Sequence, residues 1–173
     1  MIMAIRKIST NLWFNNQAEE AAYFYTSIFK QSSVGRVIRY GEVRHPIDGL
    51  SEGDAMTVEF ELEGNTYVAL NGGPQYQFTE AISFIVHCDT QEELDYYWEN
   101  LSEGGDESAQ VCGWLKDRYG VSWQIVPAML NDLLADADSS QYNRVMKTLL
   151  QMKKINIEQL EQAAKGEQDN KGE

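Results

Sequence analysis

Histidine is scarce in this chain, and acidic residues outnumber basic ones. Only 2 of the 173 residues are histidine, and 14 lysines and arginines stand against 27 aspartates and glutamates, for a formal net charge of −13. A nucleic-acid backbone requires a basic surface on its partner, and so does an anionic membrane. No apolar run approaches the roughly 20 residues that a membrane-spanning helix needs. We therefore expect no nucleic-acid partner and no membrane partner.

Cysteine is as rare as histidine. Cys88 and Cys112 are too few for a disulfide scaffold. The segment Met1–Arg6 is too short for the apolar core of a signal peptide, so a cytoplasmic protein is expected. The hydrophobic content of 43% is sufficient for a buried core.

The first part of the chain is predicted to form a strand, a helix and three more strands. Period-2 alternation predicts a strand over Ile5–Phe14, and apolar residues at three- and four-residue spacing predict a helix over Gln17–Phe29. Asn15-Asn16 is a turn and a candidate cap for that helix. Further strands are expected at Val34–Tyr40, Met56–Leu62 and Thr66–Leu70.

The same order of elements recurs in the second part. A strand is expected over Ala81–His87, followed by a helix over Gln91–Leu101 that Thr90 caps. The buried stripe of this helix is expected to be Leu94, Trp98 and Leu101. Short strands follow around Gln110–Val111, Leu115–Lys116 and Val121–Val126. The repeat lies in the structural pattern and not in residue identity.

Beyond Pro127 the pattern is helical. Helices are expected over Met129–Ala135, Gln141–Met152 and Ile157–Ala164, with Asn156 capping the last. The predicted fold class is α+β, with two tandem βαβββ modules over about 1–75 and 76–128 that form one domain. A helical extension covers 129–165, and the polar segment 166–173 is expected to be disordered.

Several segments together resemble a known group of proteins. They are LWFNNQAEEAAYFYTSIF (12–29), VALNGGP (68–74), AISFIVHC (81–88), CGWLKDRYGVSWQIVP (112–127) and MKKINIEQLEQA (152–163). The chain resembles the PhnB-like group of the vicinal-oxygen-chelate, or glyoxalase-like, superfamily, a group often labelled 3-demethylubiquinone-9 3-methyltransferase. The resemblance implies the same tandem βαβββ fold and a homodimer.

The resemblance also implies where a metal would bind, namely on the first and fourth strands of the modules. A divalent ion prefers imidazole or carboxylate ligands there. The first strand offers Ser9, Thr10 and Asn11, the strand Thr66–Leu70 offers no such ligand, the next module offers Ser83, and the last strand offers Gln124. We therefore predict no metal and no cofactor.

Strand alternation predicts a polar site on the face away from the helices. If the apolar face of the first strand lies under its helix, Asn11 and Trp13 face the concave side, whereas a one-residue slip would put Leu12 and Phe14 there. The predicted ligand-binding residues, expected to share one cavity, are Asn11, Trp13, Ser83, Cys112, Trp114, Ser122 and Gln124. Such a lining suits an uncharged polar or aromatic small ligand. The alternative is that these side chains satisfy one another and no ligand binds.

Three classes of function stay open at this point. We favour a metal-independent small-molecule binder; the alternative is an enzyme in which Cys112 acts as a nucleophile or a histidine, His45 or His87, acts as a base. Methyl transfer is not expected, because Gly72-Gly73 precedes Pro74 and no helix follows to receive a cofactor. The third class is a pure dimerisation scaffold, which a concave face filled with side chains would favour. Separately, unpaired strand edges and exposed aromatics favour a homodimer. The aromatics in question are Tyr76, Phe78, Tyr96 and Tyr97.

Overall fold

The computed structural model describes residues 8–42, 47 and 49–166. The chain divides into two compact units that part between Phe78 and Thr79. His45, the first three residues (5–7) of the first predicted strand and the segment 167–173 of the predicted tail lie outside the described residues.

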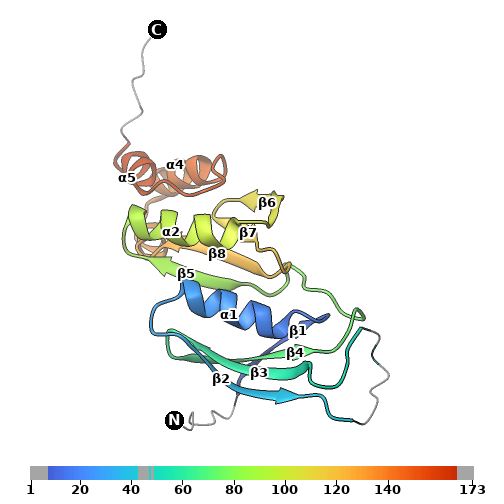
Figure 1. Ribbon diagram of the computed structural model, residues 1–173. Helices are drawn as coiled ribbons and strands as arrows, with labels where there is room; N and C mark the ends of the chain where they lie inside the picture. The colour runs from blue at the N-terminus through green and yellow to red at the C-terminus, as the bar shows by residue number, and fades with distance from the viewer. Residues whose placement is uncertain (1–7, 43–46, 48, 167–173) are drawn as a thin grey trace. The chain divides into compact units, whose positions relative to one another are not determined.

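Unit 1 is a four-stranded sheet with one helix packed on one face (Figure 1). Its strands are β1 (Thr10–Phe14), β2 (Ser33–Arg39), β3 (Ala55–Leu62) and β4 (Asn65–Asn71), and its helix is α1 (Ala18–Ile28). Their order in the sheet is β1-β4-β3-β2, and β1 runs parallel to β4 while the other pairs are antiparallel. The predicted βαβββ module is confirmed here.

The alternation along β1 decides which side chains reach the core. Leu12 and Phe14 are 6% and 3% exposed, while Asn11 is exposed and Trp13 is half-buried. The buried pair lies beneath α1, whose Tyr25 stacks on Phe60 of β3. The predicted register is therefore confirmed, and Asn11 and Trp13 lie on the sheet face away from the helix.

Helix α1 is capped from a distant strand and not by its own neighbours. Its N-cap residue, Gln17, makes no side-chain cap hydrogen bond. The backbone N–H of Ala18 donates instead to Oδ1 of Asn71 at 2.8 Å, and Nδ2 of Asn71 donates to the carbonyl of Ala55 at 2.9 Å. The prediction that Asn15-Asn16 caps this helix is wrong, because the buried amide of Asn71 satisfies its first turn from β4.

Unit 2 repeats this topology. Its strands are β5 (Phe84–Cys88), β6 (Asp106–Val111), β7 (Trp114–Lys116) and β8 (Ser122–Pro127), and its helix is α2 (Gln91–Ser102). Their order is β5-β8-β7-β6, which matches unit 1 strand for strand. Thr90 caps α2 by accepting from the N–H of Glu93, as predicted. The buried stripe of α2 includes the predicted Leu94, Trp98 and Leu101.

Two strands of unit 2 start three or more residues away from their predicted starts, and two aromatics expected to be exposed are not. Strand β5 starts at Phe84 because residues 79–82 form a turn, in which Ile82 N–H donates to the carbonyl of Thr79. Strand β6 begins at Asp106, four residues before the predicted strand around Gln110–Val111, because Asp106 pairs with Lys116 of β7. Tyr97 is buried on the apolar stripe of α2, so it is not an exposed aromatic. Phe78 is half-buried, because its ring packs edge-on against Phe14.

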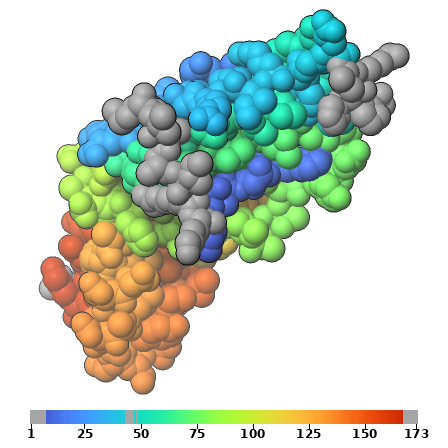
Figure 2. Space-filling view, turned by 90° about the horizontal axis from the view of Figure 1, so that it is seen from below, coloured from blue at the N-terminus to red at the C-terminus, as the bar shows by residue number. Residues whose placement is uncertain are grey.

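The C-terminal segment is helical, as predicted (Figure 1), and belongs to unit 2; Figure 2 shows part of its surface in orange to red. It comprises α3 (Leu130–Ala135), α4 (Ser139–Leu149) and α5 (Ile157–Lys165). Helices α4 and α5 pack on each other through Val145, Leu149 and Leu160, which are all buried. Asn156 caps α5 through its side chain, as predicted. No helix in the described part of the chain is long and apolar enough to cross a bilayer.

Candidate functional site

The sheet face of unit 2 that lies away from α2 carries a row of polar and aromatic side chains. Strand pairing places Ile85 of β5 beside Gln124 of β8, and Gln124 beside Trp114 of β7. The alternate residues of these strands, among them Trp123 and Ile125, are buried against the helix. Three of the predicted site residues, Ser83, Trp114 and Gln124, are thus brought to one face, and all three are half-buried.

Gln124 is held in place by a serine from the start of the neighbouring strand. Its Nε2 donates to the hydroxyl of Ser83 at 2.8 Å. This single bond uses one of the two amide donors and leaves both lone pairs of the amide oxygen for another group. The pair therefore offers both a donor and an acceptor on a half-buried surface.

Ser122 lies next to this pair, and its buried hydroxyl is unsatisfied. It is 1% exposed, and its hydroxyl has no hydrogen-bond partner among the described residues. A buried polar atom without a partner costs about 1–3 kcal/mol, so such atoms are rare in folded proteins. Ser122 is the strand partner of Lys116, whose Nζ forms an ion pair with the exposed Glu80. That ion pair lowers the pKa of the Glu80 carboxyl.

Trp13 is fixed in unit 1 by the glycine pair that follows β4. Its Nε1 donates to the carbonyl of Gly73 at 2.9 Å, and its ring packs edge-on against Tyr76 at a centroid distance of 4.9 Å. A Cβ on Gly72 would stand 2.2 Å from Cζ2 of Trp13, so only glycine fits beneath the indole. Asn11 lies two residues away on the same face and is exposed. That Asn11 and Trp13 share a cavity with the residues of unit 2 stays a prediction.

The two cysteines occupy very different environments. Cys88 is buried at the end of β5, and desolvation raises the pKa of its thiol to about 12. Cys112 is half-buried in the two-residue turn between β6 and β7, with a positive φ of 51°. Its backbone N–H donates to the carbonyl of Met152 at 2.8 Å. Cys88 is thus a buried core residue, whereas Cys112 is a turn residue, and His87, the histidine that the structure describes, is not bonded to it.

The donor groups on these faces do not fit a catalytic divalent ion. Apart from the single imidazole of His87, the face offers serine hydroxyls, a glutamine amide, an indole and a lysine in place of the imidazoles and carboxylates that such an ion prefers. Among the described residues there is no group of three or more His, Cys, Asp or Glu that could hold a metal ion. His87 is exposed at the end of β5, two residues beyond Ile85 and on the same face.

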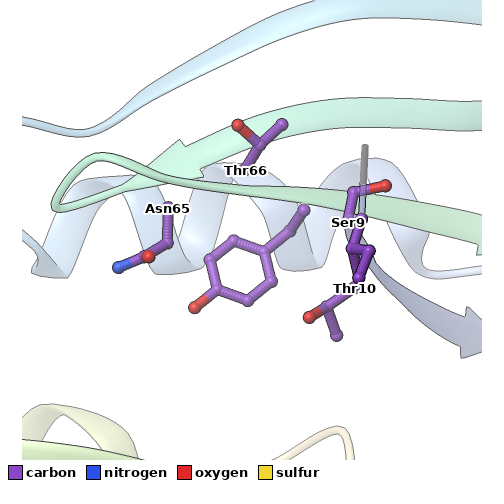
Figure 3. A pocket seen from close by; sticks show the side chains of 6 residues that line it. Ser9, Thr10, Asn65 and Thr66 are labelled. Atoms are coloured by element: carbon purple, nitrogen blue, oxygen red, sulfur yellow. The ribbon is translucent and has the colours of Figure 1, made fainter. Parts of the chain in front are cut away.

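Two hollows in unit 1 lie apart from the predicted site residues. One, of about 150 Å³, is formed by the start of β1 and the start of β4, where Ser9, Thr10, Asn65 and Thr66 surround it (Figure 3). The other, of about 230 Å³, is polar and includes Arg39 and Glu19, which form an ion pair at 2.9 Å. Both hollows are small and open.

Sequence reasoning missed several groups that belong to the candidate site. Lys116 and Tyr76 stand beside predicted residues but were not assigned to the site, and His87 was considered only as a base and not as a residue of this face. For Lys116 and His87 the signal was available, because strand alternation puts them on the same face as Trp114 and Ile85. For Tyr76 no pattern signals the contact, since it follows Pro74 in irregular backbone.

Comparison with known proteins agrees with this architecture. The family described as 3-demethylubiquinone-9 3-methyltransferase matches residues 6–126. The PhnB protein from Bacillus cereus is 35% identical with a TM-score of 0.63, and the match covers 71% of this chain and 100% of that one.

Two more distant structures also match. A protein from Staphylococcus aureus is 28% identical over 73% of this chain and 99% of that one, with a TM-score of 0.33. Protein PA1353 from Pseudomonas aeruginosa is 20% identical over 69% of this chain and 95% of that one, with a TM-score of 0.54. The comparison with curated proteins finds no match.

Proposed function

The chain belongs to the 3-demethylubiquinone-9 3-methyltransferase, or PhnB-like, family of the vicinal-oxygen-chelate superfamily, and on that premise we propose that it binds an uncharged polar or aromatic small molecule without a metal. The proposed site is the face of the unit 2 sheet formed by Ser83, Trp114, Ser122 and Gln124. The observation that carries the proposal is the buried hydroxyl of Ser122, which has no partner among the described residues, beside the Ser83–Gln124 pair.

The chemistry of this face defines the ligand class. The amide oxygen of Gln124 accepts a hydrogen bond, and the hydroxyls of Ser83 and Ser122 donate one. Trp114 supplies an aromatic wall, against which a flat ring gains contact area. Lys116, the one cationic side chain that we place on this face, already forms an ion pair with Glu80, so it is not available to pair with an anionic ligand. A neutral aromatic amide or phenol fits these groups.

Methyl transfer from S-adenosylmethionine is not supported by the geometry. The cofactor's usual site is a glycine-rich turn between a strand and a helix N-terminus. Here the N–H groups of Gly72 and Gly73 are bonded to the carbonyls of Phe14 and Asn15, and Gly72 lies against Trp13. Isothermal titration with S-adenosylmethionine tests this point, and saturable micromolar binding at one site per chain would refute it.

A metal-independent enzyme is the second candidate, because His87 shares the face of Ile85 and Gln124. An imidazole there could act as a base toward a ligand bound at Gln124. The two candidates differ in one substitution. His87→Asn abolishes turnover in the enzyme and leaves ligand affinity unchanged in the binder.

The proposal is tested by native mass spectrometry of protein taken directly from cells. We expect an added mass of a small organic molecule on the wild-type chain and its loss in the Gln124→Ala variant. Benzamide serves as an added probe in the same experiment, with benzoate as the charged comparison. Tighter binding of benzoate than of benzamide would contradict the proposed ligand class.

A further inference from the structure

The tip of the β6–β7 hairpin is covered by a segment from the far end of the chain. Cys112 and Gly113 form the two-residue turn, with φ angles of 51° and 84°. Their N–H groups donate to the carbonyls of Met152 and Lys153, both at 2.8 Å. In a hairpin turn at a protein surface, such backbone N–H groups ordinarily donate hydrogen bonds to water. Here they hold the segment Met152–Ile157, which we call the strap.

Side-chain packing makes this contact close. A Cβ on Gly113 would stand 2.8 Å from Cδ1 of Ile155 and 2.9 Å from the carbonyl oxygen of Ile125. Ile155 is 1% exposed, and the N–H of Ile125 donates to the carbonyl of Gly113 at 2.8 Å. The turn, strand β8 and the strap therefore meet at Gly113, and no larger residue fits there without displacing one of them.

The other side of the strap is bonded to helix α2. Gln91 donates through Nε2 to the carbonyl of Ile155 at 3.1 Å and accepts through Oε1 from the N–H of Ile157 at 2.8 Å. Lys154 forms an ion pair with Asp95, one turn along α2, at 2.7 Å, and this contact lowers the pKa of the Asp95 carboxyl. The strap thus ties the hairpin tip to the first two turns of the helix.

Trp114 is the site residue that lies next to this arrangement. It follows Gly113 directly in the chain and pairs with Gln124 across β7 and β8. We propose that the strap positions Trp114 against the ligand site, and that Gln91 is a positioning residue acting through the strap. This inference rests on the proposed function. The C-terminal segment, which lies beyond the residues matched by the family, would then set the affinity of the site.

A pair of glycines in unit 2 provides a matched test. Gly113 and Gly120 both have a φ of +84°, but a Cβ on Gly120 meets nothing within 4 Å. Gly113→Ala and Gly120→Ala therefore place alanine at the same positive φ, and only the first also brings a Cβ against the strap and strand β8. Gln91→Met removes both strap hydrogen bonds at similar side-chain volume, and it serves as the second variant if Gly113→Ala does not fold.

We expect Gly113→Ala and Gln91→Met to weaken benzamide binding at least fivefold, while Gly120→Ala, at a comparably lowered melting temperature, binds as the wild type does. Folded Gly113→Ala and Gln91→Met proteins with wild-type affinity would overturn the inference.

A second readout needs no bound ligand, and it separates failure of this inference from failure of the proposed function. Acrylamide quenching of the Trp114 fluorescence, taken as the difference between each protein and its Trp114→Phe derivative, reports the position of the indole. It should change in Gly113→Ala and Gln91→Met and not in Gly120→Ala. If benzamide does not bind the wild type, the proposed function is refuted. If quenching is unchanged in both Gly113→Ala and Gln91→Met, the claim that the strap positions Trp114 is refuted.

Discussion

The indole of Trp13 lies directly against the backbone of Gly72, where a Cβ would be 2.2 Å from Cζ2 of the ring. The carbonyl of the next residue, Gly73, accepts the indole N–H at 2.9 Å. The indole of Trp13 therefore packs on, and is hydrogen-bonded to, the backbone of the Asn-Gly-Gly-Pro segment. This contact accounts for the presence of Gly72-Gly73 by packing alone, so the glycine pair needs no cofactor-binding role to explain it.

Replacing Gly72 with alanine is expected to destabilise the protein by about 1–3 kcal/mol, the usual cost of overpacking a close contact. The same change at Gly41, where a Cβ meets nothing within 4 Å, is the control and should have little effect. Urea denaturation followed by tryptophan fluorescence measures both. Equal stability of the two variants would show that the Trp13 contact is not tight.

The two cysteines should differ in reactivity. With its pKa raised to about 12, the Cys88 thiol is neutral at pH 8 and buried, so it should resist Ellman's reagent, whereas the half-buried Cys112 should react in the folded protein. Mass spectrometry of tryptic peptides assigns the label. Rapid native-state labelling of Cys88 would contradict the burial described here.

The raised pKa of Cys88 also has a consequence for stability. A group whose pKa is higher in the folded state stabilises that state fully below its unfolded pKa and loses the effect as pH rises. The free energy of unfolding should therefore fall between pH 9 and about pH 12 by more in the wild type than in Cys88→Ala. Denaturation curves across this range measure the difference, and parallel pH profiles would count against it.

No stoichiometric divalent metal is expected in the protein purified without chelators. Gln124 and Ser83 bond to each other, and neither is a good ligand for such an ion. Elemental analysis provides the measurement. About one zinc, nickel, manganese or iron per chain, lost on changing Gln124 to alanine, would show that the face does hold a metal.

A homodimer is predicted from the outer strands of each sheet and from exposed side chains such as Tyr76 and Ile85. Light scattering at micromolar concentration should give twice the chain mass. Deleting residues 156–173 should leave the dimer intact, because α5 packs on α4 of its own chain, where Arg144 bonds the carbonyls of Ala163 and Ala164. A monomer mass for the full chain would refute the prediction.

Much of the fold could be predicted because local patterns and burial agree. The alternation of Leu12 and Phe14 with Asn11 and Trp13 is strong, and the helix that follows needs an apolar surface to cover. The caps at Thr90 and Asn156 are local signals within four residues of their partners. The cap of α1 could not be predicted, since Asn71 reaches Ala18 across 53 residues of sequence.

The candidate site was predictable to a lesser degree. Alternation places Ser83, Trp114 and Gln124 on one face. It does not predict that Gln124 donates a hydrogen bond to Ser83, or that the hydroxyl of Ser122 has no hydrogen-bond partner among the described residues. Cys112 was predicted to line the site, and the positive φ at Cys112 and Gly113 shows that it lies in a tight turn. The contacts of the strap could not be predicted from the sequence, because its hydrogen bonds join residues about 40 to 66 positions apart.

The most direct test of the account is a pair of measurements on Ser122→Ala. Removing a buried hydroxyl without a partner should leave the free protein as stable as the wild type or more stable, by up to about 1 kcal/mol. In a ¹H–¹⁵N titration of the wild type with benzamide, the indole N–H of Trp114 and the side-chain amide of Gln124 should shift saturably. The indole N–H of Trp123, which is bonded to Asp117, should not. The account predicts that Ser122→Ala weakens this binding at least tenfold. Shifts of equal size and midpoint in the two proteins, or no shift at Trp114 in either, would contradict it.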